Sequence, residues 1–120
     1  MAVIGFSYQP EEIWCAAGWI FRQVLDDVSS RYPEDSEIAD EFDGARARSG
    51  LGLDLVESEL AARIATAIWQ VASGILSGEI RSGLEDRPDG DAERIQEYRE
   101  ALRELLDVFP AVWRETHPLE

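Results

Sequence analysis

The stretch from Leu60 to Gly78 constrains the fold more than any other part of the sequence. It carries a single charge, Arg63, in a chain of which 30% of the residues are charged. Its apolar residues recur at spacings of three and four, the period of a helix with a wide buried face. They form two adjoining stripes, which comprise Leu60, Ile64, Ile68, Val71 and Ile75, and Ala61, Ala65, Ala72 and Leu76. We therefore predict a central helix from about Glu57 to Ser77 that stops at Gly78 and has other helices packed around it.

Two helices are predicted before this central one. The first is expected to begin near Pro10 and to end near Ser30, because proline and acidic residues suit a first helical turn. Its apolar stripe comprises Ile13, Ala17, Ile20, Val24 and Val28, widened by Phe21 and Leu25. A shorter second helix is expected to open at Pro33, with few apolar positions, namely Ile38, Ala39, Phe42 and Ala45.

After the second helix we expect a loop, and after the central helix a fourth helix. The loop covers residues 49–55, where two glycines flank Leu51 and no convincing partner strand exists. Asp91 is a suitable N-cap for the fourth helix, and Pro110 ends or kinks it. Its one-sided stripe comprises Ile95, Tyr98, Leu102, Leu105, Leu106 and Phe109. These segments predict an all-α fold: a small irregular bundle of about four helices around a nearly apolar third helix, in a single domain covering residues 1–120.

The charge balance indicates the kind of partner. The formal net charge is −14, from 25 carboxylates and 11 arginines, and lysine is absent. Phosphates are normally bound by clustered lysine and arginine, so we expect a basic protein partner, with no direct nucleic acid and no membrane. The lack of lysine beside many arginines is typical of a GC-rich bacterial genome. No basic segment precedes Arg22, and the longest uncharged run, residues 64–78, is shorter than the roughly 20 residues of a membrane span, so we expect a cytoplasmic protein.

Residues for catalysis or metal binding are few. Cys15 and His117 are each the only residue of their type, which favours a helix cysteine and a tail histidine over a nucleophile–base pair, and excludes a zinc site. The residues around Gly90 resemble a calcium loop, but they place Arg87 at the third position and Gln96 at the twelfth.

Carboxylate pairs are the remaining route to a metal. Glu37 with Asp40, and Glu97 with Glu100, have the Glu-x-x-Asp and Glu-x-x-Glu spacing by which all-helical pyrophosphohydrolases hold magnesium. Such pairs also arise by chance in so acidic a chain. No glycine-rich phosphate loop occurs. We therefore expect no catalytic residue, no metal and no cofactor.

The most unusual feature is an acidic segment, residues 34–43, with six carboxylates and no positive charge. They are Glu34, Asp35, Glu37, Asp40, Glu41 and Asp43. Six acids without an arginine between them repel one another, a cost that a cationic partner would relieve, although a solvated face is the simpler interpretation. Trp19 is expected on the charged side of the first helix, where an exposed tryptophan would anchor an interface, or pack against the C-terminal tail or a second copy.

These features favour a non-catalytic acidic binding protein that neutralises a basic toxin or nuclease by stoichiometric binding, as immunity and antitoxin proteins do. The acidic segment and Trp19 are its expected partner-binding residues. Two alternatives remain: a small metal-dependent helical hydrolase that uses the carboxylate pairs, and a homodimeric regulatory module that exposes Trp19 or Trp69.

Overall fold

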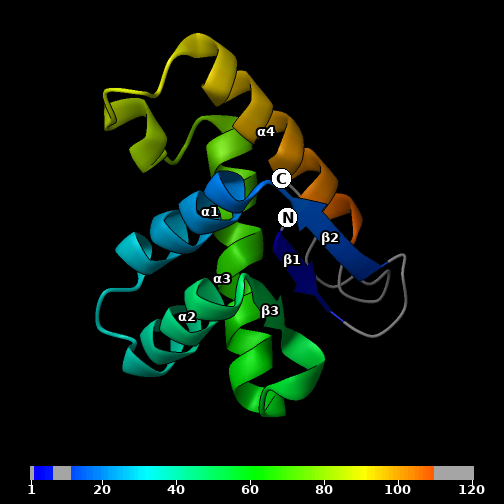
Figure 1. The fold of residues 1–120 in the computed structure, drawn as a ribbon. Helices are drawn as coiled ribbons and strands as arrows, with labels where there is room; N and C mark the ends of the chain where they lie inside the picture. The colour runs from blue at the N-terminus through cyan, green and yellow to red at the C-terminus, as the bar shows by residue number, and fades with distance from the viewer. Residues whose placement is uncertain (1, 7–11, 110–120) are drawn as a thin grey trace.

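The computed structural model describes residues 2–6 and 12–109, which form a mostly helical fold with a small sheet at one side (Figure 1). In chain order the elements are β1 (Ala2–Gly5), β2 (Ile13–Ala16), α1 (Gly18–Arg31), α2 (Ser36–Arg48), β3 (Gly50–Gly52), the 3-10 turn η2 (Leu53–Leu55), α3 (Ser58–Ser77), the 3-10 turn η3 (Gly83–Asp86) and α4 (Ala92–Asp107). The predicted proline stop at Pro110 and the tail histidine, His117, lie outside the described residues.

Helix α3 is central, as its apolar pattern predicts. It packs against α1, α2 and α4, and it runs between them in Figure 1. The Glu57 carboxylate caps its first turn by accepting hydrogen bonds from the backbone N–H groups of Glu59 at 3.0 Å and Leu60 at 3.1 Å. Gly78 ends it in the left-handed conformation, at φ 87°, which glycine adopts without a steric cost. The predicted bounds of this helix are confirmed.

The caps of α4 and α2 show how accurately local signals place a helix start. Asp91 caps α4 as predicted, because its carboxylate accepts a hydrogen bond from the Arg94 N–H at 2.8 Å. Helix α2 begins at Ser36, three residues after the predicted start at Pro33, because Asp35 accepts a hydrogen bond from the Ile38 N–H at 3.1 Å and is the N-cap. Pro33 therefore belongs to the turn between α1 and α2.

The expectation of an all-α fold holds only in part: the fold is mostly helical, with four α-helices among the described residues, but three short strands form a sheet in the order β2-β1-β3. Strands β1 and β2 are antiparallel, with Ile4 opposite Trp14, and β1 and β3 are parallel, with Ile4 opposite Leu51. Residues 13–16, expected in the first helix, are strand β2, and α1 begins only at Gly18. Residues 50–52, expected in a loop, are strand β3.

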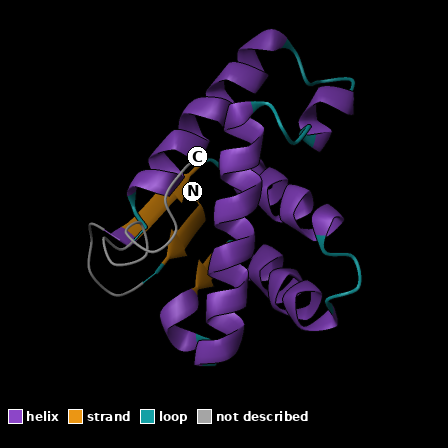
Figure 2. Cartoon of the chain, turned by 180° about the vertical axis from the view of Figure 1, so that it is seen from behind, coloured by secondary structure: helices purple, strands orange, loops and turns teal. Residues whose placement is uncertain are grey.

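The sheet has one buried and one open face. Its buried side chains are Ala2, Ile4, Trp14, Ala16 and Leu51, which join the core of the helices in a single apolar cluster. Trp14 links the sheet to α4, because its indole Nε1 donates a hydrogen bond to the Ala101 carbonyl at 3.0 Å. In Figure 2 the strands are seen at the side of the helical layer. The fold is therefore a helical bundle that buries one face of a small sheet.

Candidate functional site

The acidic segment occupies the α1–α2 turn and the first two turns of α2. Glu34, Glu37, Asp40 and Asp43 are exposed, whereas Asp35 and Glu41 are half-buried. Six carboxylates thus follow one another along a surface helix and the turn that precedes it.

Arginines from elsewhere in the chain neutralise part of this segment. Arg63 of α3 donates to Asp35 at 2.8 Å and to Glu37 at 3.1 Å. Arg46 lies between Asp43, at 3.0 Å, and Asp26 of α1, at 2.9 Å, and Arg48 is 3.5 Å from Glu41. The expectation of six uncompensated acids is therefore wrong. With Asp26 included, seven carboxylates meet three guanidinium groups, so an excess of four negative charges remains.

Asp35 is fixed by its role at the start of α2. The hydrogen bond from the Ile38 N–H and the Arg63 guanidinium lower the pKa of Asp35 below its usual value of 3.8. The same contact with Asp35 raises the pKa of Arg63. Both groups therefore stay charged at neutral pH, and the carboxylate of Asp35 has a structural function whatever the segment binds.

A hollow of about 530 Å³ opens in the α1–α2 turn, at the N-terminal end of the acidic segment. It is lined by Arg31, Tyr32, Pro33, Glu34, Asp35, Ser36 and Glu37. The Tyr32 hydroxyl donates a hydrogen bond to the Gln70 side-chain oxygen at 2.6 Å, which fixes the aromatic ring at the wall. Among the described residues, no arginine forms an ion pair with Glu34 or Asp40. The hollow thus combines an aromatic surface with three carboxylates and one arginine, Arg31. Of the three carboxylates, only Glu34 has no ion pair with a described arginine, and it is the group that suits a guanidinium or ammonium group.

Trp19 does not lie with the acidic segment. It sits at the opposite end of α1, about 18 Å along the helix from Arg31 at 1.5 Å per residue. The ring is half-buried and packs against the core, and the Arg94 guanidinium stacks over it at 4.8 Å from the ring centroid. The expectation of an exposed Trp19 is wrong, because this contact with α4 covers it. Its contact with a partner stays a prediction.

A buried polar cluster, which the sequence analysis missed, centres on Asp27 of α1. This carboxylate is 4% exposed and accepts four hydrogen bonds. The donors are the Tyr98 hydroxyl at 2.7 Å, the Ser82 hydroxyl at 2.6 Å, the Gly83 N–H at 2.8 Å and the Gln23 side-chain amide at 3.0 Å. Burial, followed by the negative charge of Asp27, raises the pKa of Tyr98 well above its usual value, so the phenol remains a donor. The cluster joins α1, η3 and α4.

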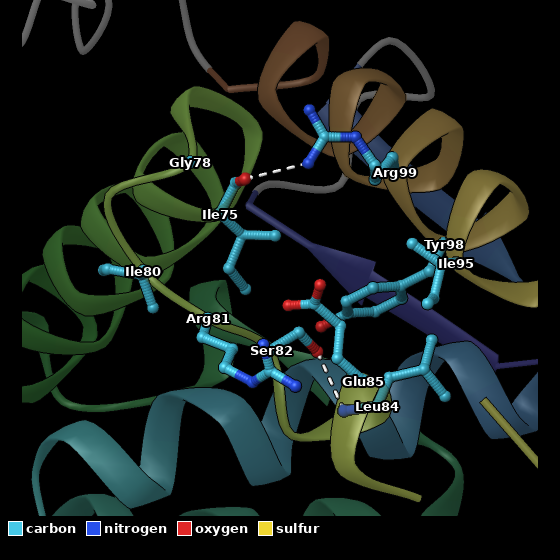
Figure 3. A pocket seen from close by; sticks show the side chains of 10 residues that line it. All are labelled: Ile75, Gly78, Ile80, Arg81, Ser82, Leu84, Glu85, Ile95, Tyr98 and Arg99. Carbon is cyan, nitrogen blue, oxygen red and sulfur yellow. Dashed lines mark hydrogen bonds between the residues drawn. The ribbon is translucent and has the colours of Figure 1, made fainter. Parts of the chain in front are cut away.

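Beside this cluster lies a cavity of about 240 Å³ between the end of α3 and the start of α4 (Figure 3). Ile75, Ile80, Leu84 and Ile95 supply its apolar wall. Most of its polar side chains are already engaged: Arg81 pairs with Asp86 at 3.0 Å, whereas Glu85 forms no hydrogen bond or ion pair with a described residue. Tyr98 and Ser82 bind Asp27, and Arg99 donates to the Ile75 and Leu76 carbonyls at 2.9 and 2.8 Å, which completes the C-terminal end of α3. The arrangement explains how three elements are held together.

The two carboxylate pairs on which the metal-dependent alternative rests lie on different helices. Helix α2, with Glu37 and Asp40, packs against α1, α3 and β3, whereas α4, with Glu97 and Glu100, packs against α3 and β2. Within residues 2–6 and 12–109, no three His, Cys, Asp or Glu side chains are placed to hold a metal ion. Cys15 is exposed on β2 instead of lying in a helix.

By length and composition, α3 is long and apolar enough to cross a membrane. Half of the residues in its most apolar window are buried inside the fold. The cytoplasmic location therefore remains a proposal.

Comparison with known proteins identifies no relative. No family model matches the chain, and no curated protein or solved structure is significantly similar to it.

Proposed function

We propose that this chain is a non-catalytic acidic protein of the cytoplasm that binds and neutralises a basic protein, in the manner of immunity proteins and antitoxins. The observation that carries the proposal is the acidic segment at the α1–α2 turn, with its aromatic-walled hollow and its excess of four negative charges. A chain with net charge −14 attracts cationic proteins from a distance, and a local excess orients them as they approach.

The arginines in this surface support the proposal in a second way. Arg46 and Arg63 hold Asp43, Asp35 and Glu37 in fixed positions. A surface that is ordered before binding loses less side-chain entropy when a partner arrives. Glu34 and Asp40, which no described arginine pairs with, are then the carboxylates that a partner's cations would meet first.

A short oligoarginine peptide serves as a defined cationic probe. We expect the triple variant Glu34→Gln, Glu37→Gln and Asp40→Asn to bind the peptide with an on-rate about three- to tenfold lower than the unmodified chain, measured by stopped-flow fluorescence. The same on-rate should fall steeply as salt rises, because exposed charges are screened over about 8 Å at physiological ionic strength.

A matched control removes three charges from another face. Glu93, Glu97 and Glu104 are exposed on α4 and form no ion pair with any described residue. Their conversion to glutamine removes the same number of negative charges but leaves the acidic segment intact. We therefore expect a smaller decrease in the on-rate. Equal decreases in the two triple variants would show that total charge, and not this segment, captures the cation.

A further inference from the structure

The cavity between the end of α3 and the start of α4 combines a hydrocarbon wall with room for a small molecule (Figure 3). Ile75 and Leu84 of this wall are buried, and Ile80 and Ile95 are half-buried. The volume of about 240 Å³ is roughly eight times the share of one water molecule in the liquid. It is below the range of about 300–1,000 Å³ that drug-sized ligands occupy. A ligand of this cavity is therefore small, with about six to ten non-hydrogen atoms.

Both arginines that line the cavity already have partners. Arg81 donates to Asp86 from Nε at 3.2 Å and from Nη2 at 3.0 Å. Arg99 donates from both terminal nitrogens to carbonyl groups in the last turn of α3. An anionic ligand would therefore have to compete with Asp86 for Arg81, and it would meet carbonyl oxygens beside Arg99.

Glu85 is the charged residue of the cavity that is left without a partner among the described residues. It is exposed and forms no hydrogen bond or ion pair with any of them, and Figure 3 shows its side chain extending from η3 into the group of lining residues. Its charge contributes to the raised pKa of Arg81 only after the hydrogen bond and the charge of Asp86. The hydroxyl groups of the buried polar cluster donate to Asp27. The charge that the cavity offers to a ligand is therefore negative.

We propose that this cavity binds a small primary amine: its ammonium group donates to the Glu85 carboxylate, and a hydrocarbon body of about four to seven carbon atoms packs against the isoleucines and Leu84. Burial of that body supplies the favourable free energy that an exposed ion pair lacks. The net charge of −14 attracts cations and repels anions, which favours an amine over a carboxylic acid. The cavity shares no lining residue with the hollow in the α1–α2 turn, so this inference does not depend on the proposed function.

Isoamylamine is a suitable probe, because it joins an ammonium group to a branched hydrocarbon body of this size. Titration of the unmodified chain, followed by two-dimensional amide NMR, should give saturable shifts at Gly78, Leu84 and Glu85, with a Kd of about 0.1–3 mM for so small a ligand. Isoamyl alcohol has the same hydrocarbon body without the charge, and methylammonium chloride has the charge without the body. Each should bind at least about tenfold more weakly, because each lacks one of the two contributions.

A pair of variants tests the role of the carboxylate. Glu85→Gln should lower the affinity for isoamylamine about tenfold, because the ammonium group loses its charged acceptor, and should leave the affinity for isoamyl alcohol unchanged. Glu79→Gln is the matched control, since Glu79 is exposed in the same connection between α3 and η3 but does not line the cavity. It should change the affinity for the amine by less than about twofold. Equal losses in the two variants would show that net charge attracts the amine, and would overturn the proposal.

Further results with the unmodified chain would also overturn the proposal. The absence of a saturable shift up to about 20 mM isoamylamine would show that the cavity does not bind an amine. Equal binding of the amine and the alcohol would leave Glu85 without a role. Tighter binding of N-acetyl-lysine amide than of isoamylamine would assign the cavity to a lysine side chain of a protein instead of a free amine. Shifts confined to residues 31–37 would place the amine in the hollow of the acidic segment, which would support the proposed function and contradict this site.

Discussion

At the scale of single residues, Asp27 has the most demanding environment in the described part of the chain. A buried carboxylate is tolerated only when hydrogen bonds replace its lost hydration, and four donors from three elements do so here. The donors are separated from Asp27 by up to 71 residues, so no local pattern in the sequence could have revealed the cluster. In the sequence, Asp27 looks like one more acid on a helix.

Removal of one donor from this cluster should be costly. We expect Tyr98→Phe to lower the free energy of unfolding by about 1.5–3 kcal/mol, because a buried hydrogen bond to a charged acceptor is lost without a change in ring packing. Tyr32→Phe is the matched control, since its hydroxyl bonds a neutral amide at an exposed site, and should cost less than about 1 kcal/mol. Urea denaturation measures both, and equal costs would contradict the special role of Asp27.

A pH effect should follow from Asp35. Its pKa in the folded protein is lowered below 3.8, so the charged carboxylate stabilises the fold fully at pH values above its unfolded pKa. This stabilisation is lost as the pH falls through the lower, folded pKa, that is, below about pH 4. Asp35→Asn keeps a cap but has no charge to lose. The unfolding free energy of this variant should therefore change less between pH 7 and pH 3 than that of the unmodified chain. An equal change of the unfolding free energy in both proteins would show that Asp35 does not contribute to the pH dependence of stability.

At the scale of elements, the structure confirms the helices with complete local signals. Helix α3 has a charge-free face and a terminal glycine, and α4 has an aspartate cap. Both helices begin close to the predicted residue, and α3 also ends where predicted. The strands could not be predicted in the same way, because a strand of three or four residues is stable only when it is hydrogen-bonded to neighbouring strands. Residues 13–16 fit a helical period as well as a strand, and Gly50–Gly52 pairs with β1 across more than 40 residues.

The acidic segment shows the same limit at the candidate site. Its position and charges could be read directly, but its neutralisation depends on Arg63, which is 26 residues beyond Glu37. Arg46 and Arg48 were nearer, but only the helical turn brings them beside Asp43 and Glu41. Charge counted within a window of sequence therefore overstates the repulsion on the folded surface.

Helix α3 should be the element whose core is most sensitive to substitution. Ile68 is fully buried at its centre. We expect Ile68→Ala to lower the free energy of unfolding by about 2–5 kcal/mol and Ile68→Asp to unfold a domain of ordinary stability. Thr66→Ala, on the more exposed side of α3, should change it by less than about 0.5 kcal/mol. A cooperative thermal transition in Ile68→Asp at the unmodified temperature would contradict the central position of α3.

At the scale of the whole molecule, the net charge of −14 acts against the compact state, because carboxylates come closer together when the chain folds. We expect the thermal midpoint to rise by about 3–6 °C, or roughly 1 kcal/mol, as sodium chloride increases from about 10 to 300 mM. Differential scanning calorimetry measures this. The triple glutamine variant of Glu93, Glu97 and Glu104 should show a smaller rise. A midpoint that falls with salt would mean that the arginine–carboxylate pairs outweigh the repulsion.

The hydrogen bond between Trp14 and Ala101 joins residues that are 87 positions apart. A ribosome adds about 5–20 residues per second, so roughly 4–17 s separate the synthesis of the two partners. During that time the nascent chain carries β2 without the helix that covers its tryptophan, and its apolar edge is accessible to other chains. Completion of the fold therefore waits for α4 to leave the ribosome.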